Sequence, residues 1–122
     1  MHPLFVYGSL KRGCHNHHLL AGQRFVGEAR TGPGYRLYDL GDYPGLVVDP
    51  TDTDGVTGEL WDVELEALAH LDEFEGVAET IYRRVRVELS APFNQIEADT
   101  YLYARDPGQR PLGPTWHDRP RS

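Results

Sequence analysis

The sequence predicts an α+β domain built on a curved sheet or a small β-barrel. Short apolar runs suited to strands recur along the chain, and turn residues separate them, since the 122 residues include 13 glycines and 9 prolines. Only one segment has convincing helical periodicity. A doubly wound fold needs helices between its strands, so that architecture is disfavoured.

Five strands are expected in the first half of the chain. The first is a short apolar run that stops abruptly at Gly8 and Ser9, as a buried strand entering a loop does. Turn signals such as Thr31-Gly32-Pro33-Gly34 separate the later ones. The expected strands span residues 4–7, 23–29, 35–40, 45–48 and 56–63.

A helix is expected over residues 64–74. An apolar stripe supports it, whereas Asp72 and other polar side chains face outward. Asp62 is the expected N-cap, Gly76 the expected stop, and Phe74 the expected anchor in the core. The stripe consists of Leu65, Leu68, Ala69 and Leu71.

Two further strands and an irregular tail complete the expected organisation. Residues 82–89 alternate strongly and should pair with residues 98–103. The Pro-, Gly- and Arg-rich residues 105–122 form the predicted tail, either mobile or folded back by Trp116. The expected domain therefore spans residues 1–104.

The charge balance disfavours several classes of function. The formal net charge is −7, and the few basic residues form no long stripe of the kind that nucleic acid requires. No apolar run approaches the ~20 residues that cross a bilayer, and the N-terminus lacks the features of a signal peptide. One cysteine, Cys14, excludes an internal disulfide and suits a reducing compartment. We expect a cytoplasmic domain with no nucleic-acid or membrane partner.

Tyr7-Gly8-Ser9-Leu10 is the first segment that could carry chemistry. A glycine at the end of a strand lets the backbone turn sharply and approach a ligand closely. The successive N–H groups of such a loop suit a carboxylate or a developing oxyanion. By pattern alone, an ordinary turn after a strand is the simpler explanation of the segment.

Glu75, just past the predicted helix, is the second candidate. A carboxyl group beside Phe74 in a pocket would have its charged form disfavoured, which would raise its pKa toward the range that general acid/base chemistry needs. The alternative is a solvated acidic helix end. Acidic groups there oppose the helix dipole, so an offsetting interaction is expected.

The histidines around Cys14 invite a metal-binding interpretation. His15, His17 and His18 are possible zinc ligands, but no second ligand cluster at a recognised spacing accompanies them. A structural loop is the simpler explanation, and Cys14 has no evident activating group. We expect no metal and no cofactor.

Read together, these segments resemble the γ-glutamylcyclotransferase family, also called AIG2-like proteins. The similarity covers most of residues 4–103, in the expected order. The matching motifs are Phe5-Val6-Tyr7-Gly8-Ser9-Leu10-Lys11-Arg12-Gly13 with Asn16-His17, Tyr38-Asp39-Leu40-Gly41, Tyr43-Pro44-Gly45, Gly58-Glu59-Leu60-Trp61, Leu71-Asp72-Glu73-Phe74-Glu75-Gly76 and Tyr82-Arg83-Arg84.

The resemblance implies a small mixed β-barrel with flanking short helices and a pocket beside the first loop. The family's loop backbone binds the glutamyl end of the substrate, which implies a binding role for Tyr7, Gly8, Ser9 and Leu10. Its catalytic glutamate matches Glu75. Tyr82 matches a tyrosine at the mouth of the following strand, either lining the pocket or filling the end of the barrel.

The implied function is that of a cyclotransferase that converts γ-glutamyl amides into 5-oxoproline and a free amine. Glu75 would act as the general acid/base while the α-amine attacks its own γ-carbonyl carbon. The expected partner is this small-molecule substrate, and the expected protein is a monomer or a weak homodimer. The alternative is a non-catalytic small-molecule-binding module that keeps the fold.

Overall fold

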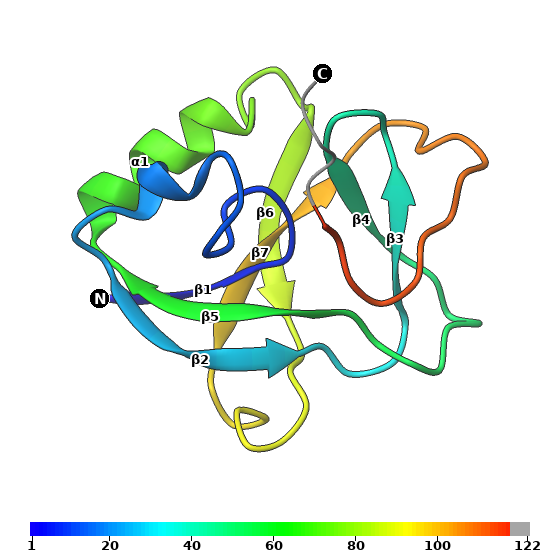
Figure 1. Cartoon of the computed structure of the whole chain (residues 1–122), viewed down its shortest axis with the longest axis horizontal. Helices are drawn as coiled ribbons and strands as arrows, with labels where there is room; N and C mark the ends of the chain where they lie inside the picture. Colours follow the sequence, from blue (N-terminus) through cyan, green and yellow to red (C-terminus); the bar gives the residue numbers. More distant parts are fainter. Residues whose placement is uncertain (118–122) are drawn as a thin grey trace.

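The computed structural model describes residues 1–117, which form one mixed seven-stranded sheet flanked by two helices (Figure 1). Strand β1 and helix α1 lie close together on one side of the molecule, and the β3–β4 hairpin lies on the other. The elements in chain order are β1 (His2–Val6), the 3-10 helix η1 (His17–Leu20), β2 (Arg24–Arg30), β3 (Tyr35–Asp39), β4 (Pro44–Val48), β5 (Thr57–Val63), α1 (Leu65–Phe74), β6 (Tyr82–Val87) and β7 (Ala98–Tyr103).

Strand β7 is the centre of the sheet. The main path runs β2-β5-β1-β7-β4-β3, and β6 pairs with β7 antiparallel along its whole length, as the sequence predicted. The other edge of β7 is shared by two parallel strands. β1 pairs with it at Leu4 and Asp99, and β4 at Leu46 and Leu102. The sheet therefore forks where β1 and β4 separate along β7.

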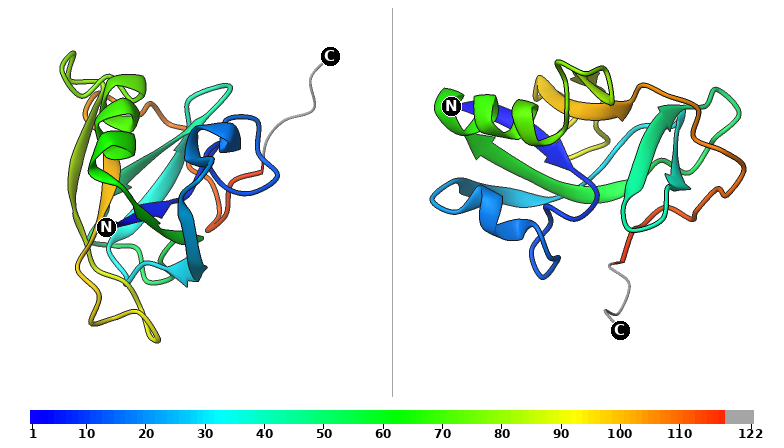
Figure 2. Two further views of the ribbon diagram at one scale, coloured as in Figure 1. Left: turned by 90° about the vertical axis from the view of Figure 1, so that its left-hand side faces the viewer. Right: turned by 90° about the horizontal axis from the view of Figure 1, so that it is seen from above.

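The mixed sheet with few helices agrees with the predicted fold class, but the closed barrel is not confirmed. Within residues 1–117 the path ends at β2 and β3, and no ladder joins these two strands. A single isolated bridge, between Thr31 and Leu89, joins the chain after β2 to the chain after β6. The views in Figure 2 show the resulting curved, open sheet.

The predicted strands are confirmed with small changes at their ends. β1 begins earlier than expected, at His2, and β5 begins at Thr57. β6 stops at Val87, because Leu89 has left the ladder with β7 and bridges Thr31.

Two apolar clusters pack on opposite faces of β1, since successive side chains of a strand alternate between its faces. Phe5 belongs to a cluster with Leu37 and Leu60, whereas Leu4 belongs to a cluster with the helix residue Leu71. Each of these side chains is almost completely buried. Helix α1 thus covers one face of the sheet near β1.

The predicted details of α1 need two corrections. Leu65 is 74% exposed, so the buried stripe narrows to Leu68 and Leu71. Asp62 lies within β5 and is not the N-cap. The N-cap is Glu64, whose backbone N–H donates to Gln23 Oε1 at 2.8 Å. The predicted stop at Gly76 is confirmed by its φ of 69°.

Residues 105–117 run back along the sheet. The N–H of Leu112 donates to the carbonyl of Leu37 at 2.9 Å, and Pro111 bridges Tyr38. Trp116 is 3% exposed and packs in the cluster that contains Phe5. Residues 118–122 of the predicted tail lie outside the described residues. Neither helix within residues 1–117 is long and apolar enough to cross a membrane.

Candidate active site

A cavity of about 230 Å³ lies at the fork of the sheet, where β1 ends and β4 begins. Parts of the chain that are far apart in sequence meet there: the loop after β1, the start of β4, the end of α1 and the strands β6 and β7. Its walls are mostly apolar and aromatic. The lining residues are Val6, Tyr7, Gly8, Ser9, Leu10, Asn16, Tyr43, Pro44, Phe74, Glu75, Ile81, Tyr82 and Tyr101.

Tyr7 holds the fork together. Its hydroxyl donates to the backbone carbonyl of Tyr101 at 2.6 Å and accepts from the backbone N–H of Leu46 at 3.3 Å. It thereby links β7 to β4 at the point where β1 has turned away. Buried backbone groups need partners, and the Tyr7 side chain supplies one to each.

Gly8, Ser9 and Leu10, in the loop after Tyr7, line the cavity. Among residues 1–117, the backbone N–H groups of Gly8, Ser9 and Leu10 donate no hydrogen bond. The loop is nevertheless held, because the side-chain amide of Asn16 donates to Ser9 Oγ at 2.9 Å and its backbone N–H donates to Ser9 O at 3.0 Å. This arrangement suits an anionic ligand group.

Gly8 is required by close packing. A Cβ atom at this position would lie 2.9 Å from Pro44 Cγ, closer than two carbon atoms approach without repulsion. The absence of a side chain therefore lets the loop pack directly against the start of β4.

The end of α1 places Glu75 in the cavity. Glu75 is the C-cap, and its N–H donates to Leu71 O at 2.8 Å. The next two N–H groups, of Gly76 and Val77, donate back to Glu73 O at 3.1 Å and Asp72 O at 3.0 Å. This is the Schellman arrangement, which needs the positive φ of Gly76 and fixes the last turn of the helix.

The environment of Glu75 changes its acidity. Burial among the side chains of the cavity raises the pKa of Glu75 from 4.5 to about 7, because desolvation disfavours the carboxylate. A group with this pKa both accepts and returns protons near neutral pH. Burial, and to a lesser degree the Glu75 charge, also raises the pKa of both Tyr7 and Tyr82.

Tyr82 lines the cavity from the start of β6. Its hydroxyl donates to the carbonyl of Pro44 at 2.9 Å, and its ring stands edge-on to Tyr103 with the centroids 5.3 Å apart. The cavity thus contains every site residue suggested by the sequence, namely Tyr7, Gly8, Ser9, Leu10, Glu75 and Tyr82.

The sequence-based predictions were wrong for Phe74 and Asp72, and they did not identify Tyr101 as a residue of the cavity wall. Phe74 was expected to anchor in the core, but it is 49% exposed and lines the cavity instead. Asp72 was expected to face solvent, yet it contacts Arg84 and Tyr101. Tyr101 carried no usable signal, because its place in an alternating strand suggested only packing.

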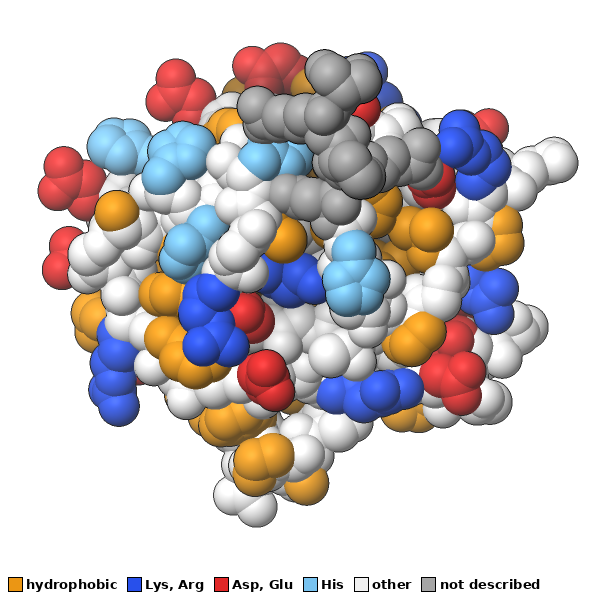
Figure 3. Space-filling view, viewed as in Figure 1, with side chains coloured by type: hydrophobic (Ala, Val, Ile, Leu, Met, Phe, Trp, Pro, Cys, Tyr) orange, Lys and Arg blue, Asp and Glu red, His pale blue; other side chains and the backbone are white. Residues whose placement is uncertain are grey.

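Among the described residues, none of the histidines His15, His17 and His18 lines the cavity. His17 Nδ1 lies 3.0 Å from the carbonyl of Leu10, and its ring packs against Trp61. Nowhere in residues 1–117 are three His, Cys, Asp or Glu side chains grouped so that they could hold a metal ion. On the face shown in Figure 3, basic and acidic side chains are interspersed.

Comparison with known proteins gives a consistent family match. The family model described as "Gamma-glutamyl cyclotransferase, AIG2-like" matches residues 4–118. A Vibrio cholerae protein whose name assigns it provisionally to the gamma-glutamylcyclotransferases is 42% identical over 102 residues, which are 84% of this chain and 82% of that protein. The gamma-glutamylaminecyclotransferase of Bos taurus is 34% identical over 113 residues, covering 86% of this chain and 67% of that protein.

The same match extends to solved structures. The crystal structure of an AIG2-like protein from Mus musculus superimposes with a TM-score of 0.83 and 26% identity. The superposition covers 99% of this chain and 97% of that one.

Proposed function

Because this chain belongs to the AIG2-like gamma-glutamyl cyclotransferase family, we propose that it releases 5-oxoproline and a free amine from γ-glutamyl amides. The observation that carries the proposal is Glu75, a carboxyl group with a pKa of about 7 in the cavity that the loop after β1 also lines. A desolvated acid/base and a set of unused backbone donors are what this reaction requires.

The reaction begins with the α-amine of the glutamyl group. This amine is mainly protonated near neutral pH and cannot attack as an ammonium ion. Glu75 removes one proton, and the amine nitrogen then attacks its own γ-carbonyl carbon to close a five-membered ring. Since the attack is intramolecular, the protein mainly has to hold the folded conformer of the substrate.

The backbone donors bind the other end of the glutamyl group. The N–H groups of Gly8, Ser9 and Leu10 have no partner within residues 1–117, so they are free to bind the α-carboxylate. Some of them can also stabilise the oxyanion that forms at the γ-carbonyl oxygen. Tyr7 contributes by linking β7 to β4 beside the cavity, and Tyr82 contributes by lining the cavity.

Glu75 completes the reaction by returning the proton. The bond between the γ-carbon and the leaving nitrogen breaks as that nitrogen receives the proton from the Glu75 carboxyl group. Expulsion would otherwise produce an unstable amide anion. Glu75 thus returns to the carboxylate, and the ring nitrogen gives up its second remaining proton to the released amine. The reaction as written needs no covalent enzyme intermediate.

The cavity wall favours leaving amines that carry no carboxylate. Among residues 1–117, no Lys, Arg or His lines the cavity, so these residues offer the carboxylate of an amino-acid leaving group no cation. Two aromatic side chains of the wall, Tyr43 at 46% and Phe74 at 49%, remain exposed and offer apolar surface. We propose γ-glutamyl amines as preferred substrates over γ-glutamyl amino acids.

The proposal is tested by incubating the protein with γ-glutamyl alkylamines, γ-glutamyl-ε-lysine and γ-glutamyl amino acids and assaying 5-oxoproline. Glu75→Gln should lower kcat by about 100-fold or more, the scale of general acid/base catalysis. The matched control is Glu73→Gln, which removes an exposed carboxylate two residues away and should leave kcat unchanged.

Two results would count against this function. If no γ-glutamyl amide yields 5-oxoproline, the protein is better explained as a binding module that keeps the fold. If Glu75→Gln turns over at the wild-type rate, the acid/base role of Glu75 is wrong, whatever the substrate.

A further inference from the structure

Three of the four tyrosine hydroxyl groups of the cavity wall, those of Tyr7, Tyr82 and Tyr101, donate their protons to the protein. Tyr7 donates to the carbonyl of Tyr101 at 2.6 Å, Tyr82 to the carbonyl of Pro44 at 2.9 Å, and Tyr101 to Asp72 Oδ1 at 2.7 Å. Each hydroxyl has one proton, so its remaining capacity is that of an acceptor. Tyr7 already accepts from a backbone N–H. The hydroxyls of Tyr82 and Tyr101 are left with accepting lone pairs.

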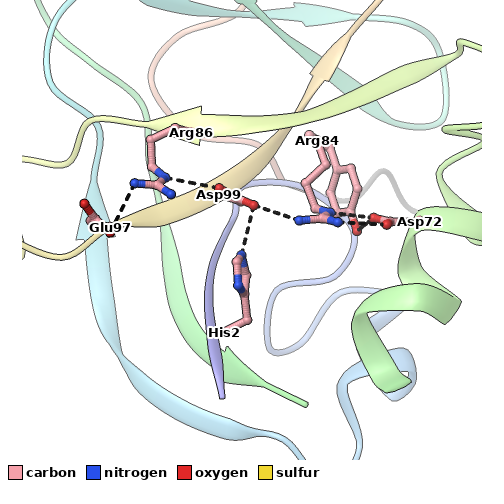
Figure 4. Close-up of polar contacts among 7 residues, drawn as sticks. His2, Asp72, Arg84, Arg86, Glu97 and Asp99 are labelled. Atoms are coloured by element: carbon pink, nitrogen blue, oxygen red, sulfur yellow. Dashed lines mark hydrogen bonds and ion pairs between the residues drawn. The ribbon is translucent and has the colours of Figure 1, made fainter. Parts of the chain in front are cut away.

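The direction of the Tyr101 hydroxyl is fixed by an ionic network (Figure 4). Arg84 Nε and Nη2 bind the two oxygens of Asp72 at 2.9 and 3.2 Å, so the acceptor of the Tyr101 proton is a paired carboxylate. Arg84 Nη1 also binds Asp99 at 2.8 Å, and Asp99 in turn contacts His2 at 2.9 Å. A network anchored at both ends leaves the Tyr101 hydroxyl little freedom to turn its proton toward the cavity.

Tyr101 and Glu75 both line the cavity. Burial, the hydrogen bond to Asp72 and the charges of Asp72 and Glu75 together raise the pKa of Tyr101, so its hydroxyl stays protonated. Tyr101 therefore adds no negative charge to the cavity. A ligand group placed between Glu75 and Tyr101 meets a carboxyl group and a neutral acceptor, and the group that complements both is a donor with several N–H bonds.

We propose that Tyr101 accepts a hydrogen bond from the α-ammonium group of the substrate beside Glu75, and that Asp72 and Arg84 are positioning residues that keep the Tyr101 proton directed away from it. This inference rests on the proposed function, in which Glu75 takes a proton from the same nitrogen. In the proposed function the backbone donors of the β1 loop bind the anionic end of the glutamyl group, so the cavity wall supplies both donors and acceptors.

The test separates binding of the ammonium group from turnover. L-Glutamine and its deamino analogue glutaramate differ only in the α-ammonium group. Their dissociation constants are measured by calorimetry in Glu75→Gln, which slows turnover by about 100-fold or more, and again after adding Tyr101→Phe. A hydrogen bond from a charged donor corresponds to roughly a 10- to 100-fold change in affinity. Tyr101→Phe should therefore reduce the preference for glutamine over glutaramate by about tenfold or more.

Two further variants make the result specific. Tyr103→Phe, on the same strand, removes the same hydroxyl from a residue outside the cavity wall and should leave the preference unchanged. Asp72→Asn does not touch the ligand, yet it should also reduce the preference, because it frees the Tyr101 hydroxyl to turn. A thermal melt of each variant confirms that it is folded.

An equal loss of affinity for both ligands in Tyr101→Phe would overturn the inference and leave Tyr101 with a structural role only. Unchanged affinities for both ligands would overturn the inference as well. The outcome is independent of the proposed reaction. A Tyr101-dependent preference in a protein that releases no 5-oxoproline would support the ammonium site while contradicting the function. Normal release of 5-oxoproline together with an unchanged preference would support the function and contradict the ammonium site.

Discussion

At the scale of single residues, the acidic end of α1 divides into three different environments. Glu73 is exposed, Asp72 is paired with Arg84, and Glu75 is held in the cavity. Successive residues of a helix point about 100° apart, and the turn at Gly76 adds a change of direction after Glu75. The sequence alone therefore predicts a cluster of acids and does not distinguish their environments. The family motif is what singled out Glu75.

The raised pKa of Glu75 makes a prediction about stability. A group with a higher pKa in the fold contributes stability that is fully present below its unfolded value of 4.5 and is lost as the pH rises through about 7. Glu75→Gln is neutral at every pH. It should therefore be more stable than the wild type at pH 9, by roughly 3 kcal/mol at most, and similar to it at pH 4. Urea unfolding at the two pH values measures the difference.

Glu73→Gln provides the comparison, because its carboxylate is already solvated. Its stability should differ from that of the wild type by no more than about 0.5 kcal/mol at either pH. Equal stability of Glu75→Gln and the wild type at pH 9 would show that Glu75 is not desolvated in the fold.

At the scale of elements, the site depends on the ends of α1, β1 and β4. Alternation and helical periodicity predicted each of these elements from local sequence. They did not predict that β1 and β4 both pair in parallel with β7, because that pairing joins residues far apart in the sequence, Leu4 with Asp99 and Leu46 with Leu102. The fork, and with it the role of the Tyr7 hydroxyl, is a property of this non-local pairing.

The turn at Gly76 connects helix geometry to catalysis. Alanine there would adopt an unfavourable positive φ and place its Cβ 2.8 Å from Ile81 Cδ1. We expect Gly76→Ala to destabilise the protein by about 1–2 kcal/mol and to lower kcat, since the last turn of α1 positions Glu75. Chemical denaturation and the 5-oxoproline assay report the two effects.

Gly108→Ala is the matched variant, because Gly108 has a φ of 77° but no atom within 4 Å of the added Cβ. It should show the cost of the backbone conformation with unchanged kcat. Equal kcat in Gly76→Ala and Gly108→Ala would argue that the end of α1 does not position the catalytic group.

At the scale of the whole molecule, the predicted fold class agrees with the structure, whereas the predicted closure of the sheet into a barrel is not confirmed. The mixed sheet with one main helix follows from short alternating strands, whereas closure depends on edges that local patterns do not describe. The path of residues 105–117 along the sheet was likewise left open by the sequence. Trp116 is large enough to favour burial, but only the structure shows that it packs in the cluster that contains Phe5.

The network of Figure 4 ties together β1, β6, β7 and α1, and it predicts sensitivity to acid. Burial alone would raise the pKa of Asp99, but hydrogen bonds from its basic neighbours outweigh burial and lower it. The stability that Asp99 contributes is therefore fully present above about pH 4 and is lost as the pH falls through its lowered pKa. Asp99→Asn should destabilise the protein at pH 7, and the difference from the wild type should shrink below pH 4.

Urea midpoints between pH 3 and 7 test this prediction, with Asp54→Asn as the control for an exposed aspartate. A difference between Asp99→Asn and the wild type that stays constant over this range would mean that ionisation of Asp99 does not contribute to stability.

The central claim is that a desolvated Glu75 accepts the proton of the substrate's amine, and the pH dependence of kcat/KM tests it most directly. The carboxylate is the active form, so kcat/KM for a γ-glutamyl amine should rise with pH and reach half of its plateau at about pH 7. The residual activity of Glu75→Gln should lack this rise. A wild-type profile that is flat between pH 5 and 8, or a midpoint near 4.5 as for a solvated glutamate, would contradict the account.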